Sequence, residues 1–228
     1  MSITIKNFAG MVDHSYLKAF ATENELLKLC REAIDYGFKS VAVNSYPVSF
    51  CRRQLEGSGV LTGAAISFPL GQMTILSKVQ EARNAHEDGA QEIDYVLNIG
   101  KAKEHNWAYI TEEMNAMVNV ARSTGMCIKV ILETCYLTDE EVIELSIIAS
   151  HIKPDFVKTS TGFGTSGATV HHVALMKSYI SSDVQIKAAG GVRTWSDARQ
   201  LIETGATRIG CSSGISIVEE MKVLGIEE

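Results

Sequence analysis

The sequence has few of the features that mark several large protein classes. Only three of its 228 residues are proline, and none of them divides a predicted helix. No uninterrupted apolar run approaches the roughly 18 residues that a membrane-spanning helix needs. The start of the chain lacks the charged segment followed by an apolar segment that is typical of a secretory signal. We therefore expect a cytoplasmic protein with no membrane partner.

Positive charge and closely spaced cysteines are also scarce. The net charge is −6 and no basic stripe is present, which argues against nucleic acid as a partner. No two cysteines have the Cys-x-x-Cys spacing, and several fall in helix-like or strand-like runs, so we expect reduced thiols rather than disulfides. The five cysteines are Cys30, Cys51, Cys127, Cys135 and Cys211.

Histidines with the spacing of metal ligands are missing as well. The six histidines are scattered, and the adjacent pair His171 and His172 should point to different faces of a helix. The chain also lacks a Walker phosphate-binding loop. We therefore predict a site that uses neither a metal nor a cofactor.

What the chain does contain is eight short apolar runs of strand type, separated by segments with helical periodicity. The first long helical segment is typical, because Thr22 followed by Glu25 predicts a capping box and Gly37 predicts the helix end. Strands that alternate with helices favour a parallel sheet. The predicted strands span residues 11–14, 39–44, 62–67, 91–98, 127–133, 155–159, 184–189 and 207–211.

Eight such units predict the α/β class and a single (β/α)8 TIM barrel over residues 1–228. The length lies near the lower end of the roughly 200 to 400 residues that such barrels have. An open doubly wound sheet is the alternative, but its Gly-x-Gly-x-x-Gly fingerprint does not follow the first predicted strand.

Three lysines stand in these apolar strands at equal intervals. Lys129, Lys158 and Lys187 are separated by 29 residues each, about one βα unit. Lysine is among the residues least often buried unpaired, so the pattern indicates a site that uses amine chemistry or a strong positive field. In the simpler alternative, each lysine extends from a barrel end to water or pairs with a carboxylate.

Lys158 is the best placed of the three lysines. It precedes the polar, glycine-rich loop that begins at Thr159, and catalytic residues of barrels lie at the carboxyl ends of strands. A lysine becomes nucleophilic when its pKa falls toward about 7 or 8, and burial beside a second ammonium has that effect. Lys187 is the candidate for this second ammonium.

An acid is expected beside these amines. Strand alternation puts Asp94, Val96 and Asn98 on one face of the fourth strand. Barrel layers are filled from alternate strands, so Asp94 and Lys158 are predicted in one layer. Lys129 and Lys187 would then occupy an adjacent layer.

Two loops near the end of the chain predict a phosphate site. Gly190 and Gly191 follow the seventh strand, and Ser212 and Ser213 follow the eighth, each loop just before a helix. Backbone amides, hydroxyls and helix N-termini in this position bind phosphate in many barrels. Either loop alone is more often an ordinary turn and helix cap.

An ordered series of motifs, covering nearly the whole chain, resembles the deoxyribose-phosphate aldolase family. It includes the segments Asp13-His14-Ser15-Tyr16-Leu17-Lys18, Glu92-Ile93-Asp94-Tyr95-Val96-Leu97-Asn98, Lys129-Val130-Ile131-Leu132-Glu133-Thr134, Val157-Lys158-Thr159-Ser160-Thr161-Gly162, Lys187-Ala188-Ala189-Gly190-Gly191 and Gly210-Cys211-Ser212-Ser213-Gly214.

The resemblance implies reversible cleavage of 2-deoxy-D-ribose 5-phosphate to D-glyceraldehyde 3-phosphate and acetaldehyde, without a metal. Lys158 would form the Schiff base, Asp94 would transfer protons through a bound water, and Lys187 would keep Lys158 partly unprotonated. Lys129 and Asp13 would complete the charge network. The four glycines and serines of the two loops would hold the substrate phosphate, and the protein would be a homodimer or a higher homo-oligomer.

The chain departs from the family pattern at two points. Many members have a C-terminal tail ending in tyrosine, whereas this sequence ends in Gly225-Ile226-Glu227-Glu228, which predicts slower turnover. Ala42 stands where many members have cysteine, which predicts better tolerance of acetaldehyde.

Two other functions are compatible with the same residues. A phosphosugar isomerase would use a carboxylate and cationic lysines for proton transfer without a covalent intermediate. A non-catalytic barrel that binds phosphosugars is the second, because fold alone does not determine function.

Overall fold

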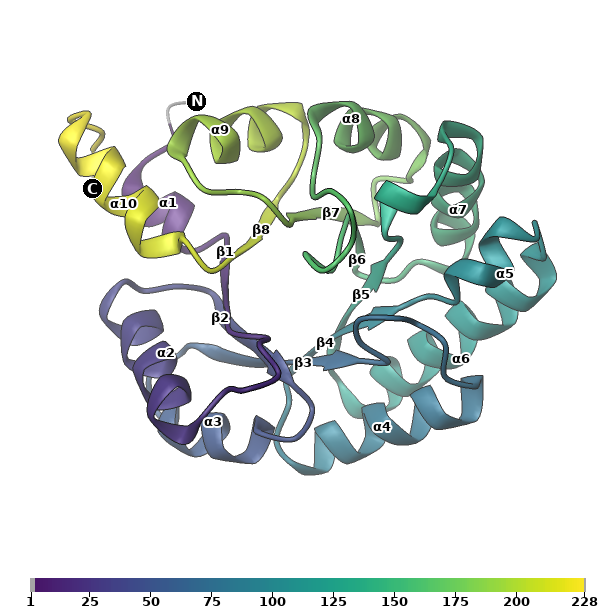
Figure 1. The fold of residues 1–228 in the computed structure, drawn as a ribbon, viewed down its shortest axis with the longest axis horizontal. Coiled ribbons are helices and arrows are strands. Elements are labelled where there is room, and N and C mark those ends of the chain that lie inside the picture. Colours follow the sequence, from purple (N-terminus) through teal and green to yellow (C-terminus); the bar gives the residue numbers. More distant parts are fainter. Residues whose placement is uncertain (1–2, 228) are drawn as a thin grey trace.

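Eight short strands close into a parallel barrel in which each strand pairs with its neighbours in sequence and β1 pairs with β8 (Figure 1). The computed structural model describes residues 3–227. The predicted (β/α)8 barrel is confirmed, with strand ends that differ from the predicted ones by at most two residues. The strands are β1 Val12–Ser15, β2 Ser40–Asn44, β3 Leu61–Ile66, β4 Glu92–Val96, β5 Cys127–Ile131, β6 Phe156–Lys158, β7 Gln185–Ala189 and β8 Arg208–Cys211.

Helices surround the barrel and connect successive strands (Figure 1). The capping box predicted at the first long helix is present, since Thr22 N donates to Glu25 Oε2 at 2.8 Å. No helix within residues 3–227 is long and apolar enough to cross a membrane. The helices are α1 Ile5–Ala9, α2 Glu23–Asp35, α3 Val48–Gln54, α4 Ile75–Glu87, α5 Ile99–Lys103, α6 Trp107–Thr124, α7 Asp139–Ile152, α8 Val170–Tyr179, α9 Trp195–Thr204 and α10 Gly214–Val223, with a 3₁₀ turn at Thr134–Tyr136.

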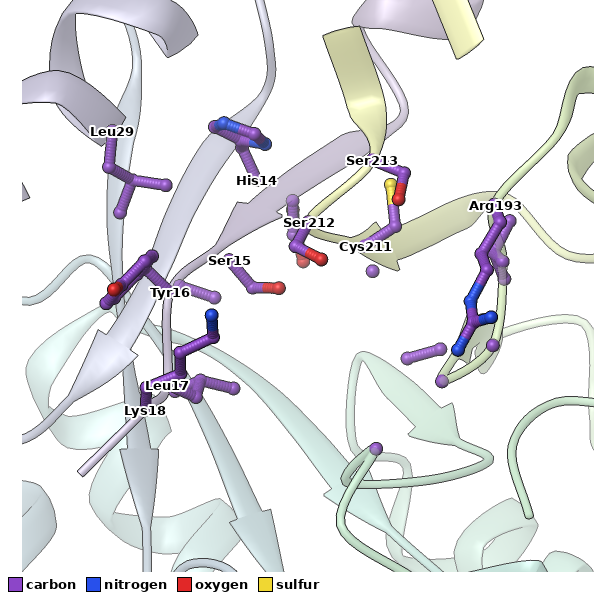
Figure 2. A pocket seen from close by; sticks show the side chains of 18 of the residues that line it. His14, Ser15, Tyr16, Leu17, Lys18, Leu29, Arg193, Cys211, Ser212 and Ser213 are labelled. Atoms are coloured by element: carbon purple, nitrogen blue, oxygen red, sulfur yellow. The ribbon is translucent and has the colours of Figure 1, made fainter. Parts of the chain in front are cut away.

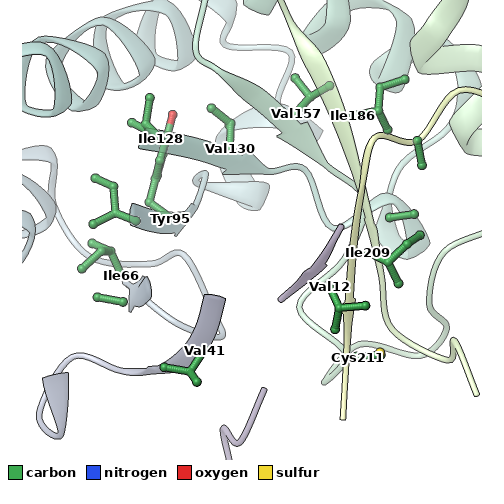
Figure 3. Packing of buried hydrophobic residues seen from close by; sticks show 14 of the residues in the cluster. Val12, Val41, Ile66, Tyr95, Ile128, Val130, Val157, Ile186, Ile209 and Cys211 are labelled. Carbon is green, nitrogen blue, oxygen red and sulfur yellow. The ribbon is translucent and has the colours of Figure 1, made fainter. Parts of the chain in front are cut away.

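The main hydrophobic core lies between the strands and the helices. Strand alternation directs side chains such as Val41, Tyr95, Val130 and Ile209 outward, where they pack under the helices (Figure 3). All four are fully buried. The outer faces of the strands therefore supply most of the apolar burial, which leaves the inner faces available for polar residues.

Two predicted strands end earlier than expected because the chain turns sharply. Asn98 does not continue β4. It caps α5 instead, and its side chain accepts a hydrogen bond from Lys101 N at 3.1 Å. Glu133 likewise leaves β5, with φ of 57°. The prediction that Asn98 shares a strand face with Asp94 and Val96 was therefore wrong.

A buried ion pair on the outer side of the barrel fixes the end of β4. Lys78 and Glu113, from α4 and α6, are both fully buried, and Lys78 Nζ lies 2.7 Å from Glu113 Oε1. Lys78 Nζ also donates to Val96 O, while Glu113 Oε2 accepts from Asn98 N. Both charged groups thus have two hydrogen-bond partners, and two of these bonds hold the backbone that follows Asp94.

We expect Lys78→Met to lower the free energy of unfolding by about 3–5 kcal/mol, because it leaves the Glu113 carboxylate buried without its cation. The double variant Lys78→Met with Glu113→Leu should recover part of this loss. Chemical denaturation measures both. As a control, Lys101→Met removes an exposed ion pair with Glu104 and should change stability by less than about 1 kcal/mol. Equal stability of Lys78→Met and the native chain would contradict the argument.

Candidate active site

The barrel register places an acid and three lysines on the inner face. Asp94 of β4 pairs in register with Lys129 of β5, and Lys158 of β6 pairs with Lys187 of β7. Residues paired in register in a parallel sheet point to the same side. All four side chains are therefore directed into the barrel, and each is at most 5% exposed.

Asp94 is the centre of this group. Its Oδ2 lies 2.7 Å from Lys158 Nζ and 2.6 Å from Lys187 Nζ, and its Oδ1 lies 2.9 Å from Lys129 Nζ. The structure thus brings together the acid and the three lysines that the sequence singled out. Both carboxylate oxygens contact ammonium groups directly, so the predicted layers of the barrel are joined into one network.

The network extends below Asp94 through residues of β1, β4 and β8. Asp13, the fifth predicted residue, contacts Lys187 through Oδ2 and accepts from Arg208 Nη1 at 2.7 Å through Oδ1. Lys129 Nζ lies 2.7 Å from Glu92 Oε2, and Glu92 also contacts Arg208 across the barrel. Sequence reasoning missed Glu92 and Arg208. Glu92 carried a usable signal, since it stands two residues before Asp94 on the same strand.

The buried network contains four cations and three carboxylates. If every group were ionised, the barrel interior would carry one net positive charge, which is unfavourable at low dielectric. Loss of one proton removes this excess. Lys158 has one carboxylate partner, whereas Lys187 has two and Lys129 has three within 4.0 Å. Lys158 is therefore the lysine that loses its proton most easily.

The pKa of Lys158 agrees with this charge balance. Burial lowers the pKa, the Asp94 carboxylate raises it, and the ammonium groups of Lys187 and Lys129 lower it again, to about 8. An amine with this pKa is neutral in about one molecule in ten at pH 7, compared with roughly one in several thousand for an ordinary lysine. Lys158 is thus a buried amine with a substantial nucleophilic fraction.

Asp94 and the deeper lysine, Lys129, remain charged. Burial alone would raise the pKa of Asp94, but the ammonium groups of Lys129, Lys158 and Lys187 outweigh it and hold the pKa well below its usual range. Burial alone would lower the pKa of Lys129, but Asp94, Glu92 and Asp13 hold it well above its usual range. These groups therefore keep fixed charges around Lys158.

A pocket of about 830 Å³ opens at the carboxyl ends of the strands, and both Lys158 and Lys187 line it. The predicted phosphate residues lie in its wall, where they are joined by Arg193, which the sequence reasoning did not single out. In Figure 2, Lys18 and Arg193 lie on opposite sides of this pocket. The phosphate residues in the wall are Gly190, Gly191, Ser212 and Ser213.

The two loops lead into helices at this end of the pocket. The loop after β7 leads into α9, and the loop after β8 leads into α10. Ser213 precedes α10 without capping it through its side chain, so that hydroxyl does not occupy the first amides of the helix. Amides at a helix start attract anions. The start of α10 thus lacks a side-chain cap, whereas Thr194 and Asp197 cap the start of α9.

The histidine prediction needs a correction. His171 and His172 do not diverge: their ring centroids are 5.4 Å apart, and His171 Nε2 lies 2.8 Å from Asp139 Oδ2. Both histidines belong to the first turn of α8, which faces the start of α7 where Asp139 lies. Within residues 3–227, these three side chains form the one group whose ligand atoms are close enough to share a metal ion. The group lies outside the barrel pocket, because none of its members lines it.

Comparison with known proteins assigns the family. The model of the DeoC/LacD family of aldolases matches residues 9–219. The chain belongs to this family. It is 50% identical over 222 residues to the deoxyribose-phosphate aldolase of Lactobacillus acidophilus, covering 97% of this chain and 94% of that one. It is 49% identical over 223 residues to the deoxyribose-phosphate aldolase of Bacteroides thetaiotaomicron, covering 98% and 94%.

A solved structure gives the same result at the level of the fold. The tetrameric deoxyribose phosphate aldolase of Aeropyrum pernix superposes with a TM-score of 0.90 at 32% identity, covering 97% of this chain and 93% of that chain. The family resemblance that the motifs indicated is confirmed.

We expect Lys187→Met to raise the pKa of Lys158 above about 8. The variant removes an ammonium that repels the charged form of Lys158. Lys158 then becomes the only lysine in contact with Asp94 Oδ2 among the described residues. The pH dependence of Lys158 labelling by an amine-reactive reagent, followed by peptide mass spectrometry, gives the midpoint. Lys6→Met, at an exposed position, is the control. A midpoint that stays the same or falls in Lys187→Met would contradict the charge balance.

Proposed function

We propose that this protein cleaves 2-deoxy-D-ribose 5-phosphate reversibly to D-glyceraldehyde 3-phosphate and acetaldehyde through a Schiff base on Lys158. One observation carries the proposal: a buried amine, whose pKa is lowered to about 8 by burial and neighbouring ammonium groups, lines the same pocket as the glycine and serine loops that follow β7 and β8. The relatives at 50% and 49% identity are deoxyribose-phosphate aldolases, which supports the choice of substrate.

The reaction begins at the substrate aldehyde. The neutral Lys158 amine adds to C1, and loss of water from the carbinolamine gives an iminium. The iminium then accepts the electron pair of the C2–C3 bond as the C3 hydroxyl loses its proton. D-Glyceraldehyde 3-phosphate leaves, and the enamine of acetaldehyde remains on Lys158. Protonation at C2 and hydrolysis release acetaldehyde and restore the amine.

Asp94 and Lys187 are the proposed proton-transfer groups. Asp94 is a carboxylate at neutral pH, and its Oδ2 contacts both Lys158 Nζ and Lys187 Nζ. It can therefore accept a proton near the reacting nitrogen while Lys187 supplies one during dehydration of the carbinolamine. A bound water between Asp94 and the C3 hydroxyl completes this proposed transfer.

Lys129 and Asp13 have a supporting role in the proposal. Each contacts a proton-transfer group, Lys129 through Asp94 and Asp13 through Lys187. Their fixed charges hold the orientation of those groups. The iminium itself is the electron sink, so the proposed reaction needs neither a metal nor a cofactor.

The phosphate would bind between the loops that follow β7 and β8. Amides of Gly190 and Gly191 and hydroxyls of Ser212 and Ser213 are the proposed donors, and all four residues line the pocket. Binding of the phosphate there would hold the opposite, aldehyde end of the substrate at Lys158. Such positioning makes the attack effectively intramolecular.

The thiol content of the pocket is compatible with an aldehyde product. Ala42 lines the pocket, as does Cys211, whose thiol pKa burial raises to about 12. A thiol with this pKa is almost entirely protonated at neutral pH and is a weak nucleophile. Better tolerance of acetaldehyde remains a prediction from the sequence.

We also propose that the protein is a cytoplasmic homo-oligomer in which residues 1–228 form one domain. The tetrameric structure of the Aeropyrum pernix relative supports the oligomer.

Incubation with deoxyribose 5-phosphate and borohydride should add one reduced adduct to the intact mass of the native chain. Lys158→Met should give no adduct and should lower cleavage by at least about a thousandfold, because no other amine replaces the nucleophile. Intact-mass spectrometry and an assay for D-glyceraldehyde 3-phosphate measure these outcomes. Turnover of a phosphosugar without an adduct would favour the isomerase, and saturable binding without turnover would favour the binding barrel.

Ser212→Ala should raise the KM for deoxyribose 5-phosphate about tenfold, since a hydrogen bond to a charged group contributes about 1.5–3 kcal/mol. Borohydride trapping of acetaldehyde, which has no phosphate, should proceed as in the native chain. Steady-state kinetics and adduct mass test the two statements together. An unchanged KM would place the phosphate elsewhere in the pocket.

A further inference from the structure

Two loops cover the barrel mouth above β4 and β5. The loop between β3 and α4 lies on the end of β4, where Gly71 approaches Leu97 so closely that a Cβ on Gly71 would lie 2.1 Å from Leu97 O. The loop between β6 and α8 lies on the end of β5, where a Cβ on Gly164 would lie 2.5 Å from Cys135 Sγ. In Figure 1 this second loop curls toward the middle of the ring of strands.

The two loops meet through an aromatic pair. Phe68 of the first loop and Phe163 of the second have ring centroids 5.4 Å apart and planes at 87°, an edge-to-face contact. Since β3 and β6 are not neighbours, this contact spans the ends of the strands between them. We call the pair the aromatic bridge.

Glu133 holds the second loop in this position. Its carboxylate is buried and accepts from Thr161 N at 3.1 Å and from Thr161 Oγ1. Thr161 Oγ1 in turn accepts from Phe163 N at 2.9 Å. Two hydrogen bonds thus join Thr161 to Glu133, just after β5, and a third joins Thr161 to the backbone of Phe163.

The backbone of Glu133 has an unfavourable conformation. Its φ of 57° and ψ of 59° lie in the left-handed region, which is unfavourable for a residue with a side chain. Within the described residues, the carboxylate has no ion pair with a lysine, arginine or histidine and is held by the Thr161 bonds and a 3.9 Å contact from Cys135 Sγ. A buried carboxylate without a cation is costly. The clearest structural effect of the Glu133 carboxylate is that it holds the loop following Lys158 in place.

Part of the charge network is not exposed to the pocket. Among the described residues, Thr161, Gly162 and Phe163 line the pocket, whereas Asp94 and Lys129 do not. Asp94 is 5% exposed and Lys129 is 1% exposed. Lys158 lies at the boundary, since it lines the pocket and contacts Asp94.

We propose that Glu133, Thr161 and Phe163 are positioning residues that hold the aromatic bridge closed over Asp94 and thereby exclude bulk water from the Asp94–Lys158 pair. The inference rests on the proposed function, because it concerns the same reaction. Water admitted at this point would solvate the charged form of Lys158 and raise its pKa. The charged groups that face Lys158 are Asp94, Lys187 and Lys129, and none of them belongs to the bridge or its support.

The test is the pH dependence of borohydride trapping of acetaldehyde. Phe163→Ala removes one ring of the bridge. Thr161→Val removes the hydroxyl that joins Glu133 to Phe163 but keeps the side-chain shape, and Thr161→Ser restores a hydroxyl. Tyr46→Ala is the matched control, because it removes a 93% exposed aromatic ring from another loop.

We expect the trapping midpoint to rise by about half to one pH unit in Phe163→Ala and Thr161→Val, which slows trapping at pH 7 by about three- to tenfold. Thr161→Ser should recover most of this loss relative to Thr161→Val, and Tyr46→Ala should keep the native midpoint. Native midpoints in both Phe163→Ala and Thr161→Val would overturn the inference and leave the proposed function intact. Absence of any adduct in the native chain would overturn the proposed function and this inference with it.

Discussion

The excess of one positive charge inside the barrel is the constraint on which the rest of the site depends. Four cations share three carboxylates in a volume that water hardly reaches, and Asp94 contacts three of the cations. Because opposite charges are better matched when one lysine is neutral, the interior itself favours an unprotonated amine. Lys158 has the fewest carboxylate partners and lines the pocket. Burial and charge therefore favour proton loss from a residue that a substrate can reach.

The fold makes this arrangement possible because it buries apolar side chains and charged side chains on opposite faces of the strands. The apolar residues that stabilise the protein lie mainly outside the strands, under the helices (Figure 3). The inner faces of β1 and of β4 to β8 then carry charges whose desolvation is offset only because each has at least one partner. A second buried pair, Lys78 with Glu113, holds the end of β4 from the helical side. The position of Asp94 is thus fixed by bonds on both sides of its strand.

Much of this could be predicted from the sequence, because strand and helix periodicity, the equal spacing of the lysines and the glycine-containing loops are local patterns. The strands, Asp94 and the three lysines were found in this way. Glu92 and Arg208 were missed because their pairing crosses the barrel and depends on its register. The left-handed turn at Glu133 and the contact between Phe68 and Phe163 join loops from different βα units, and no local pattern encodes them. His171 and His172 were misjudged because helical spacing alone does not fix the distance between two neighbouring rings, which here is 5.4 Å between centroids.

The most direct test of the charge balance is an NMR titration of the chain with ¹³C at the lysine ε-carbons, with Lys158 assigned by comparison with Lys158→Met. The account predicts that the Lys158 signal titrates with a midpoint near 8, clearly below the other lysines. A midpoint near 10.4, the value of an ordinary lysine, would contradict it, because the amine would then be almost fully protonated at neutral pH.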